Sequence, residues 1–148
     1  MNLPPQLICK RIAFLRSFAT CSLPSCFIEA VNSEIPHICI SDNKYDLDSH
    51  GKGEGYHASA PPAAIFTASS TVDVSKVLRL CNEHRVPVIA FGTGTSVEGH
   101  VAAINPNSIS LDMNKFKEIG LPHDGILDDA FIEVGAGVTR LELNDALR

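Results

Sequence analysis

The stretch Val86-Pro87-Val88-Ile89-Ala90-Phe91-Gly92-Thr93-Gly94-Thr95-Ser96-Val97-Glu98-Gly99-His100 decides the fold of this chain. Its first part, residues 86–91, is a compact apolar run that predicts a buried strand. Its second part, residues 92–100, combines three glycines with three hydroxyl side chains. Such a loop leaves backbone N–H groups open and keeps Cβ atoms out of the way, which a bound pyrophosphate requires.

Two common phosphate-binding loops do not match this segment. A P-loop needs a Lys after its second Gly, but His100 follows Gly99. The Rossmann fingerprint needs a third Gly where Val97 stands, and Pro106 comes too soon for a crossover helix, although Asp112 is suitably placed for a ribose contact. From the residues alone, a glycine-rich turn without a ligand is an equal alternative.

The residues before the loop predict a strand–helix–strand unit. Residues 64–66 predict a short strand, and a helix should begin around residues 69–71. Its apolar positions follow a helical spacing: Val74, Val77, Leu78 and Cys81. The helix should end near His84, because Pro87 disfavours helical geometry at the residue before it. A strand, a helix and a strand in this order predict a right-handed unit with parallel strands.

The residues after the loop predict three further elements. Residues 109–111 and 130–134 predict strands. Thr139 and Glu142 have the spacing of a capping box, which predicts a last helix. Because the chain stops inside this helix, we expect the sequence to be truncated.

Length, charge and hydropathy narrow the class of protein. A chain of 148 residues predicts a single domain, and a net charge of −5 argues against nucleic acid as a general partner. The longest uncharged stretch, residues 55–72, is rich in Ala and Ser and contains Pro61 and Pro62, so no membrane span is predicted. The five cysteines form no C-x-x-C pair, which suggests neither a zinc site nor a disulfide framework, and we expect Cys81 in the core.

Two segments precede the predicted domain. Residues 1–28 contain three basic side chains and no acidic one, which is typical of a mitochondrial transit peptide cleaved close to Ala19; a tail without function is the alternative. Residues 29–62 predict an irregular leader that wraps onto the domain. Within it, residues 46–51 fail as a calcium loop because His57 occupies the position of the bidentate Glu, so we expect a solvated loop around His50.

Three segments together resemble the start of the FAD-binding domain of the vanillyl-alcohol-oxidase/PCMH flavoenzymes: residues 63–66, 80–84 and 86–100. Within that superfamily, the string from Gly94 to His100 is most similar to the mitochondrial FAD-linked D-lactate dehydrogenases. Residues 134–147 resemble the next flavin-contacting turn and helix of the family. The resemblance covers about residues 44–148.

The resemblance implies the roles of nine residues. The FAD pyrophosphate would lie on the loop formed by Gly92, Thr93, Gly94, Thr95 and Ser96, with Gly99 and His100 completing the bend. Gly137 and Val138 would lie near the flavin or its ribityl chain. His100 is either a cofactor or substrate contact or a packed loop histidine. The FAD would be noncovalent, because Thr95 stands where some relatives carry the linking histidine.

The fold that the resemblance implies is α+β: the first lobe of a PCMH-type FAD-binding domain, a small mixed sheet packed with helices, spanning residues 63–148 and incomplete. The implied function is that of a fragment of a mitochondrial oxidoreductase. It would oxidise D-lactate or a related D-2-hydroxy acid and pass electrons to cytochrome c or a similar acceptor. The alternative is a catalytically inert remnant that binds FAD weakly or is purely structural. No residue of the chain is predicted to be catalytic or to bind a metal.

Overall fold

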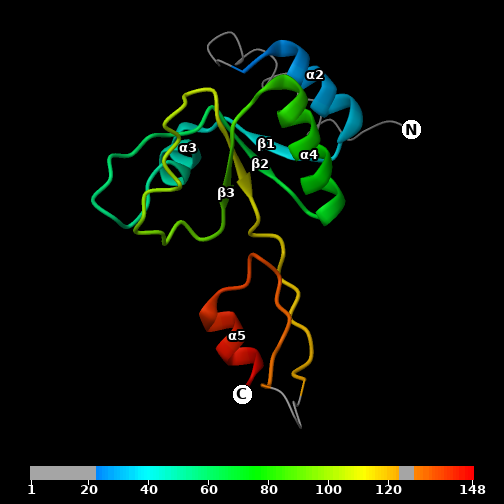
Figure 1. Cartoon of the computed structure of the whole chain (residues 1–148), viewed down its shortest axis with the longest axis vertical. Coiled ribbons are helices and arrows are strands. Elements are labelled where there is room, and N and C mark those ends of the chain that lie inside the picture. The colour runs from blue at the N-terminus through cyan, green and yellow to red at the C-terminus, as the bar shows by residue number, and fades with distance from the viewer. Residues whose placement is uncertain (1–22, 124–128) are drawn as a thin grey trace.

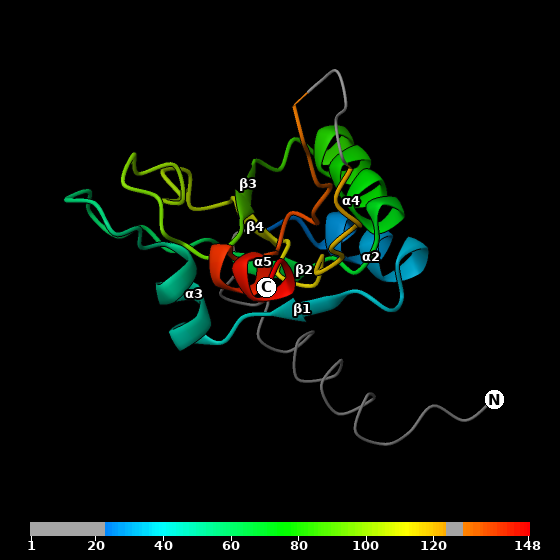
Figure 2. The ribbon, with the colours of Figure 1, turned by 90° about the horizontal axis from the view of Figure 1, so that it is seen from below.

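The structure, a computed structural model, describes residues 23–123 and 129–148. A four-stranded sheet lies between two helices on one face, α2 (Ser25–Glu34) and α4 (Thr71–His84), and one helix on the other, α3 (Lys44–His50) (Figures 1 and 2). The chain that follows the last strand leads away from the sheet to α5 (Arg140–Ala146), which lies apart from these layers (Figure 1). We call this segment between the sheet and α5 the ribbon.

The sheet is mixed, as predicted. Its strands are β1 (Cys39–Ser41), β2 (Ala64–Thr67), β3 (Val88–Phe91) and β4 (Ile109–Asp112), in the spatial order β1-β2-β4-β3. Strands β2, β4 and β3 run parallel, and β1 pairs antiparallel with β2. The carboxyl ends of the three parallel strands therefore meet at one edge of the sheet.

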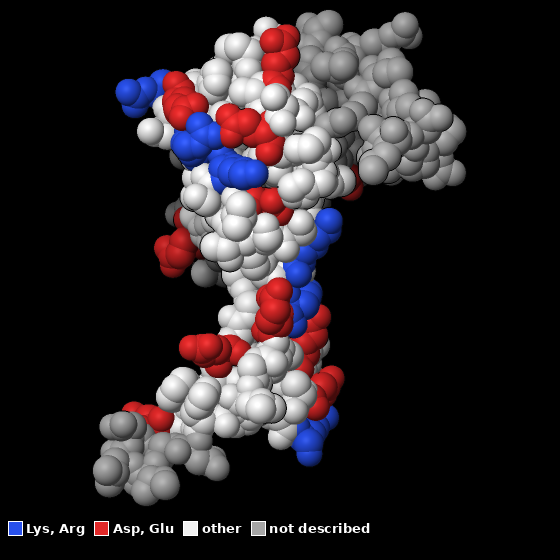
Figure 3. All heavy atoms as spheres, turned by 90° about the vertical axis from the view of Figure 1, so that its right-hand side faces the viewer, with Lys and Arg blue, Asp and Glu red and all other residues white. Residues whose placement is uncertain are grey.

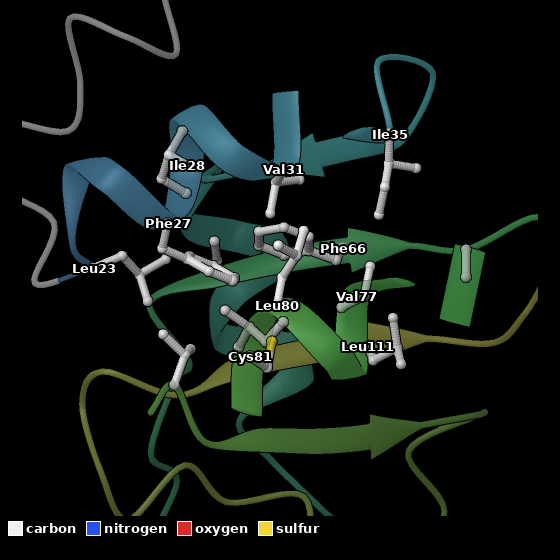
Figure 4. Close-up of a cluster of buried hydrophobic side chains, with 14 residues drawn as sticks. Leu23, Phe27, Ile28, Val31, Ile35, Phe66, Val77, Leu80, Cys81 and Leu111 are labelled. Atoms are coloured by element: carbon white, nitrogen blue, oxygen red, sulfur yellow. The ribbon is translucent and has the colours of Figure 1, made fainter. Parts of the chain in front are cut away.

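The hydrophobic core lies between the sheet and helices α2 and α4 (Figure 4). Phe27 of α2 and Phe66 of β2 are fully buried, with ring centroids 5.9 Å apart. Ile109 and Leu111 of β4 complete the floor of this core. Each large apolar side chain buried in this way stabilises the fold by roughly 1.5–3 kcal/mol.

Helix α4 begins and ends as predicted. The Ser70 hydroxyl caps its first turn by accepting from the N–H of Asp73, and Arg85 ends it in the left-handed region at φ 56°.

Three of the four predicted apolar positions of α4 pack in the core, because Val77 and Cys81 are buried and Val74 is partly buried. The fourth, Leu78, is 45% exposed, and Leu80 is buried instead. Both are leucines, so only the packing of α2 and the sheet against the helix selects between them.

Residues 29–62 are not the irregular leader that we predicted. They contain most of α2 and the whole of β1 and α3. Three residues of the expected transit peptide, residues 1–28, also pack in the core: Leu23, Phe27 and Ile28. The expected boundary after residue 28 falls inside α2 and separates Phe27 and Ile28 from Val31, so neither segment alone shows a helical period. Residues 1–22, with the predicted cleavage site, lie outside the described residues.

Two predicted strands differ in the structure. β3 was expected to be buried, but Ala90 is exposed and only Phe91 is buried, because β3 occupies an edge of the sheet. Residues 130–134 form no strand; they make isolated antiparallel bridges, Ile119 with Val134 and His123 with Phe131. This pairing belongs to the ribbon leading to α5, where glycines next to the bridged residues interrupt a regular ladder.

The capping box of α5 is confirmed. The Thr139 hydroxyl accepts from the N–H of Glu142, and the Glu142 carboxylate accepts from the N–H of Thr139. That carboxylate also lies 2.9 Å from Nζ of Lys117, and these hydrogen bonds lower the pKa of Glu142 to about 2. This ion pair joins α5 to Lys117, which lies in the ribbon shortly after β4.

Charges of both signs alternate on the face shown in Figure 3, which includes α2 and α4. Arg79 of α4 pairs with Glu34 of α2 and with Glu83 one helical turn onward. Within residues 23–123 and 129–148, no helix combines the length and apolar character needed to cross a membrane.

Candidate cofactor-binding site

The glycine-rich loop begins directly after β3, at the edge where the parallel strands end. It lines an open concave cavity of about 340 Å³, whose walls are Gly92, Thr93, Gly94, Thr95, Ser96, His100 and Val101. The carboxyl edge of parallel strands is where ligands bind in open α/β sheets. Six of the nine predicted site residues thus line one cavity, and Gly99, Gly137 and Val138 do not.

The backbone of this loop is open to a ligand. Among the hydrogen bonds within the described part of the chain, none is donated by the backbone N–H of Thr93, Gly94 or Thr95. A Cβ built on Gly92 would meet no atom within 4 Å. The cavity therefore has N–H donors and unobstructed space beside the backbone, which suit an anionic group.

Hydroxyl groups complete the polar lining. Oγ1 of Thr93 lies 3.1 Å from Oγ1 of Thr95. Oγ of Ser96 lies 2.8 Å from Nδ1 of His100 and also accepts from the N–H of Glu98. His100 is thus held by the loop itself, with its side chain exposed at the cavity.

Two glycines have a backbone conformation that other residues rarely adopt. Gly94 has φ 73° and Gly99 has φ 75°. A Cβ on Gly94 would lie 3.0 Å from the Phe91 ring, and one on Gly99 would lie 2.6 Å from the ring of His57. Both positions therefore require glycine for conformation and for space.

Residues 51–60 form a supporting wall beside the loop. The N–H of Glu54 donates to the carbonyl of Ser96 over 3.0 Å. A Cβ on Gly53 would come within 2.6 Å of that same carbonyl oxygen, and one on Gly55 within 2.5 Å of the carbonyl oxygen of Val97. These glycines interrupt any periodicity in the sequence. They allow the backbone of residues 53–55 to contact the backbone of residues 96–97.

His50 lies beneath the loop, contrary to the prediction of a solvated loop around it. Its side chain is 11% exposed and stacks on the Phe91 ring, with centroids 3.7 Å apart. Its Nδ1 lies 2.9 Å from Oγ of Ser110, and its Nε2 lies 4.0 Å from Oδ2 of Asp112. Sequence reasoning missed this residue, although Asn43, which caps α3, was a signal for a short helix ending at His50.

Burial determines the protonation of His50. Desolvation lowers the pKa of the imidazole, and the nearby carboxylates of Asp112 and Asp46 oppose this effect only in part. His50 is therefore neutral at pH 7 and can accept from the Ser110 hydroxyl at Nδ1.

Gly137 and Val138 lie outside the cavity. A Cβ on Gly137 would come within 2.4 Å of the carbonyl oxygen of Met113, and its N–H donates to the carbonyl of Phe116. Met113 in turn donates to the carbonyl of Phe91, the residue before the loop. Gly137 thus lies at the same sheet edge as the loop, packed against the chain that continues β4.

The described residues contain no group of three or more His, Cys, Asp or Glu side chains placed to hold a metal ion. Cys26, Cys39 and Cys81 are free thiols. Cys81 lies in the core, as predicted, and burial raises the pKa of its thiol to about 12. It is a packing residue and not a nucleophile.

Comparisons with known proteins agree with this geometry. A family model described as "FAD binding domain" matches residues 62–148. The chain is 34% identical to "Probable D-lactate dehydrogenase, mitochondrial" of Danio rerio, over 68% of the chain and 20% of that protein. It is 36% identical to "D-lactate dehydrogenase [cytochrome] 1, mitochondrial" of Saccharomyces cerevisiae, over 72% of the chain and 19% of that protein. The chain thus spans about one fifth of the length of these curated relatives.

Solved structures share the fold at lower sequence identity. An alkyldihydroxyacetonephosphate synthase matches 85% of the chain and 25% of its own length, with a TM-score of 0.65 and 19% identity. A p-cresol methylhydroxylase matches 85% of the chain and 25% of its own length, with a TM-score of 0.60 and 21% identity. The resemblance to the PCMH-type fold, inferred from sequence, is confirmed.

Proposed function

Because the chain belongs to the FAD binding domain family, which matches residues 62–148, we propose that its glycine-rich loop binds the pyrophosphate of FAD noncovalently. One observation carries this proposal: within the described part of the chain the N–H groups of Thr93, Gly94 and Thr95 donate no hydrogen bond, and these residues line a cavity together with Gly92, whose Cβ position is open. The family match supports FAD as the ligand, and the geometry of the loop supports residues 92–96 as its site.

The chain's own groups would hold the pyrophosphate by hydrogen bonds. The three N–H groups would donate to phosphate oxygens, and the hydroxyls of Thr93, Thr95 and Ser96, which line the same cavity, would supply further donors. Hydrogen bonds to a charged group contribute about 1.5–3 kcal/mol each. His100, fixed by Ser96, closes one side of the cavity, and Gly137 and Val138 would lie toward the flavin.

We further propose that the chain is part of an oxidoreductase acting on D-lactate or a related D-2-hydroxy acid, with cytochrome c or a similar protein as electron acceptor. Support comes from the names of the relatives at 34% and 36% identity. When bound, FAD supplies the acceptor for the hydride of the substrate carbon. The chain's contribution is to bind and orient FAD, since none of its residues is assigned to the oxidation itself.

A second candidate function is a catalytically inert domain that binds FAD weakly. The exposure of Thr93 and Thr95 favours it, because water competes with a cofactor for their hydrogen bonds. We expect residues 1–148 alone not to reduce a dye with D-lactate. Turnover in that assay would contradict this expectation and favour the enzyme over the inert domain.

The test of FAD binding uses Gly92→Val. A Cβ at this position meets no atom within 4 Å and Gly92 lines the cavity, so we expect the fold to persist while the new side chain obstructs the cavity. Titration of the chain with FAD, followed by flavin fluorescence, should show a dissociation constant raised at least about tenfold, which corresponds to about 1.4 kcal/mol. Ala90→Val is the matched control, because it adds a branched side chain at an exposed position of β3. Equal affinities for Gly92→Val and the control would contradict the proposal.

We also propose a mitochondrial location. The basic, acid-free composition of residues 1–28 supports it, as do the names of the relatives. Protein isolated from purified mitochondria should begin close to Ala19 or Thr20 when its N-terminus is sequenced. Cytosolic protein with an intact Met1 would contradict the proposal.

A further inference from the structure

A buried contact joins α3 to the glycine-rich loop through a single aromatic ring. The Phe91 ring stacks on the His50 imidazole, with an interplanar angle of 19°. The same ring lies against the Cα of Gly94, where a Cβ would be 3.0 Å from Cζ and 3.2 Å from Cε2. Phe91 therefore contacts both the helix and the middle of the loop.

His50 is itself held from two sides. Its Nδ1 lies 2.9 Å from Oγ of Ser110, and Ser110 is fully buried in the central strand β4. Gly51 follows immediately, and the contact of its Cα with the backbone of Ala60 and Pro61 would admit no Cβ. The imidazole is thus fixed relative to the sheet, whereas Thr93 and Thr95, on either side of Gly94, are exposed.

We propose that His50 is a positioning residue for the glycine-rich loop: its ring holds Phe91 in the orientation that supports Gly94 and so aligns the N–H groups of residues 93–95. This proposal rests on the proposed binding of pyrophosphate by these groups. His50 does not line the cavity and acts only through Phe91. An aligned loop binds a ligand more tightly because less freedom is lost on binding.

A purely structural role makes a different demand on His50. If its purpose were only to pair with the buried Ser110 hydroxyl, any side chain with a polar atom at the Nδ1 position would serve. If its purpose is to position Phe91, a flat ring is required and the hydrogen bond is dispensable. Two substitutions separate these demands.

His50→Asn retains a polar group near the Nδ1 position and removes the ring. His50→Phe, combined with Ser110→Ala so that no buried hydroxyl is left unpaired, retains a ring and removes the hydrogen bond. His50→Gln is a second variant without a ring, in case His50→Asn does not fold. Cooperative thermal unfolding followed by circular dichroism identifies the variants that fold.

The first readout needs no ligand. In the 148-residue chain, the NMR shift of the Gly94 Hα protons should be displaced by the ring current of Phe91. We expect His50→Asn and His50→Gln to move this shift toward its value in Phe91→Leu. The double variant His50→Phe/Ser110→Ala should leave the shift near that of the original chain.

The second readout is FAD affinity, which should fall about tenfold in the variants without a ring at position 50 and recover in His50→Phe/Ser110→Ala.

Ringless variants that fold and keep the Gly94 shift would overturn the proposal. Loss of the shift in His50→Phe/Ser110→Ala, with retention in His50→Asn, would instead show that the hydrogen bond matters and would also overturn it. If the original chain bound no FAD, the proposed function would fail, while the Gly94 shift would still decide whether His50 positions the loop.

Discussion

The two faces of the sheet differ in chemistry although they share the same strands. Along β4, Ile109 and Leu111 point into the apolar core beneath α2 and α4. The alternate residues, Ser110 and Asp112, lie on the face covered by α3, where they approach His50. Because side chains alternate along a strand, one short segment can stabilise the fold on one face and support a binding loop on the other.

The largest expected effect is on the apolar face. Phe66→Ala removes a fully buried ring that packs on Phe27 and should lower the free energy of unfolding by about 3–5 kcal/mol. Urea unfolding followed by circular dichroism measures this loss. Val72→Ala, at a side chain of α4 that is 61% exposed, should change it by less than about 0.5 kcal/mol. A similar loss in both variants would remove the distinction between core and surface.

Substitution within the loop should separate binding from folding. Gly94→Val places a branched side chain at φ 73° and against the Phe91 ring, so it should reduce both FAD affinity and stability. Gly92→Val should reduce FAD affinity by a similar factor with little change in melting temperature. Parallel FAD titrations and thermal melts measure the two quantities. A melting temperature lowered equally in both variants would show that residue 92 contributes to the stability of the fold, and the loop would then not separate binding from folding.

A smaller effect is expected on the α3 face. Ser110→Ala removes the partner of the buried His50 Nδ1 and should destabilise the fold by about 1–3 kcal/mol, less than Phe66→Ala. Urea unfolding measures the loss. Thr71→Ala, at an exposed hydroxyl of α4, is the control for a side-chain truncation of similar size. A loss as large as that of Phe66→Ala would mean that the two faces contribute equally to stability.

The smallest effect concerns pH and the start of α4. Burial raises the pKa of Asp73, but hydrogen bonds from His37 and Ser69 outweigh it and hold the pKa well below the ordinary value of 3.8. A lowered pKa contributes stability above the pKa of the unfolded chain, and this contribution is lost as the pH falls through the lower, folded value. Stability should therefore decline below about pH 4.

Asp73→Asn should weaken that decline, and urea midpoints at pH 3 and pH 6 measure it. His37→Phe, which removes one of the hydrogen bonds to the carboxylate, should give an intermediate dependence. If Asp73→Asn leaves the difference between the urea midpoints at pH 3 and pH 6 unchanged, other carboxylates cause the decline in stability.

Local patterns predicted the part of the fold from β2 to β4. The spacing of apolar residues, the position of Pro87 and the glycines after Phe91 sufficed for three strands, a helix and the loop. β1 and α3 escaped prediction because three strand residues, and a seven-residue helix that buries little besides the His50 side chain, show no period.

The role proposed for His50 could not be found in this way, since it depends on the stacking of its ring on Phe91, which follows in a distant part of the sequence. Gly53 and Gly55 looked like breaks in a pattern, but their purpose is contact with the backbone of the loop. Both features depend on which segments the sheet brings together, and no local pattern encodes that.

The central claim, that residues 92–96 bind the FAD pyrophosphate, is tested most directly by NMR titration of the 15N-labelled chain. FAD and ADP both carry a pyrophosphate, whereas riboflavin carries the flavin ring and its ribityl chain without a phosphate. With FAD and with ADP, we expect the amide protons of Thr93, Gly94 and Thr95 to shift downfield as they donate to phosphate oxygens, and with riboflavin we expect them to stay in place. Shifts confined to other residues, or equal shifts of these amides with riboflavin, would contradict the claim.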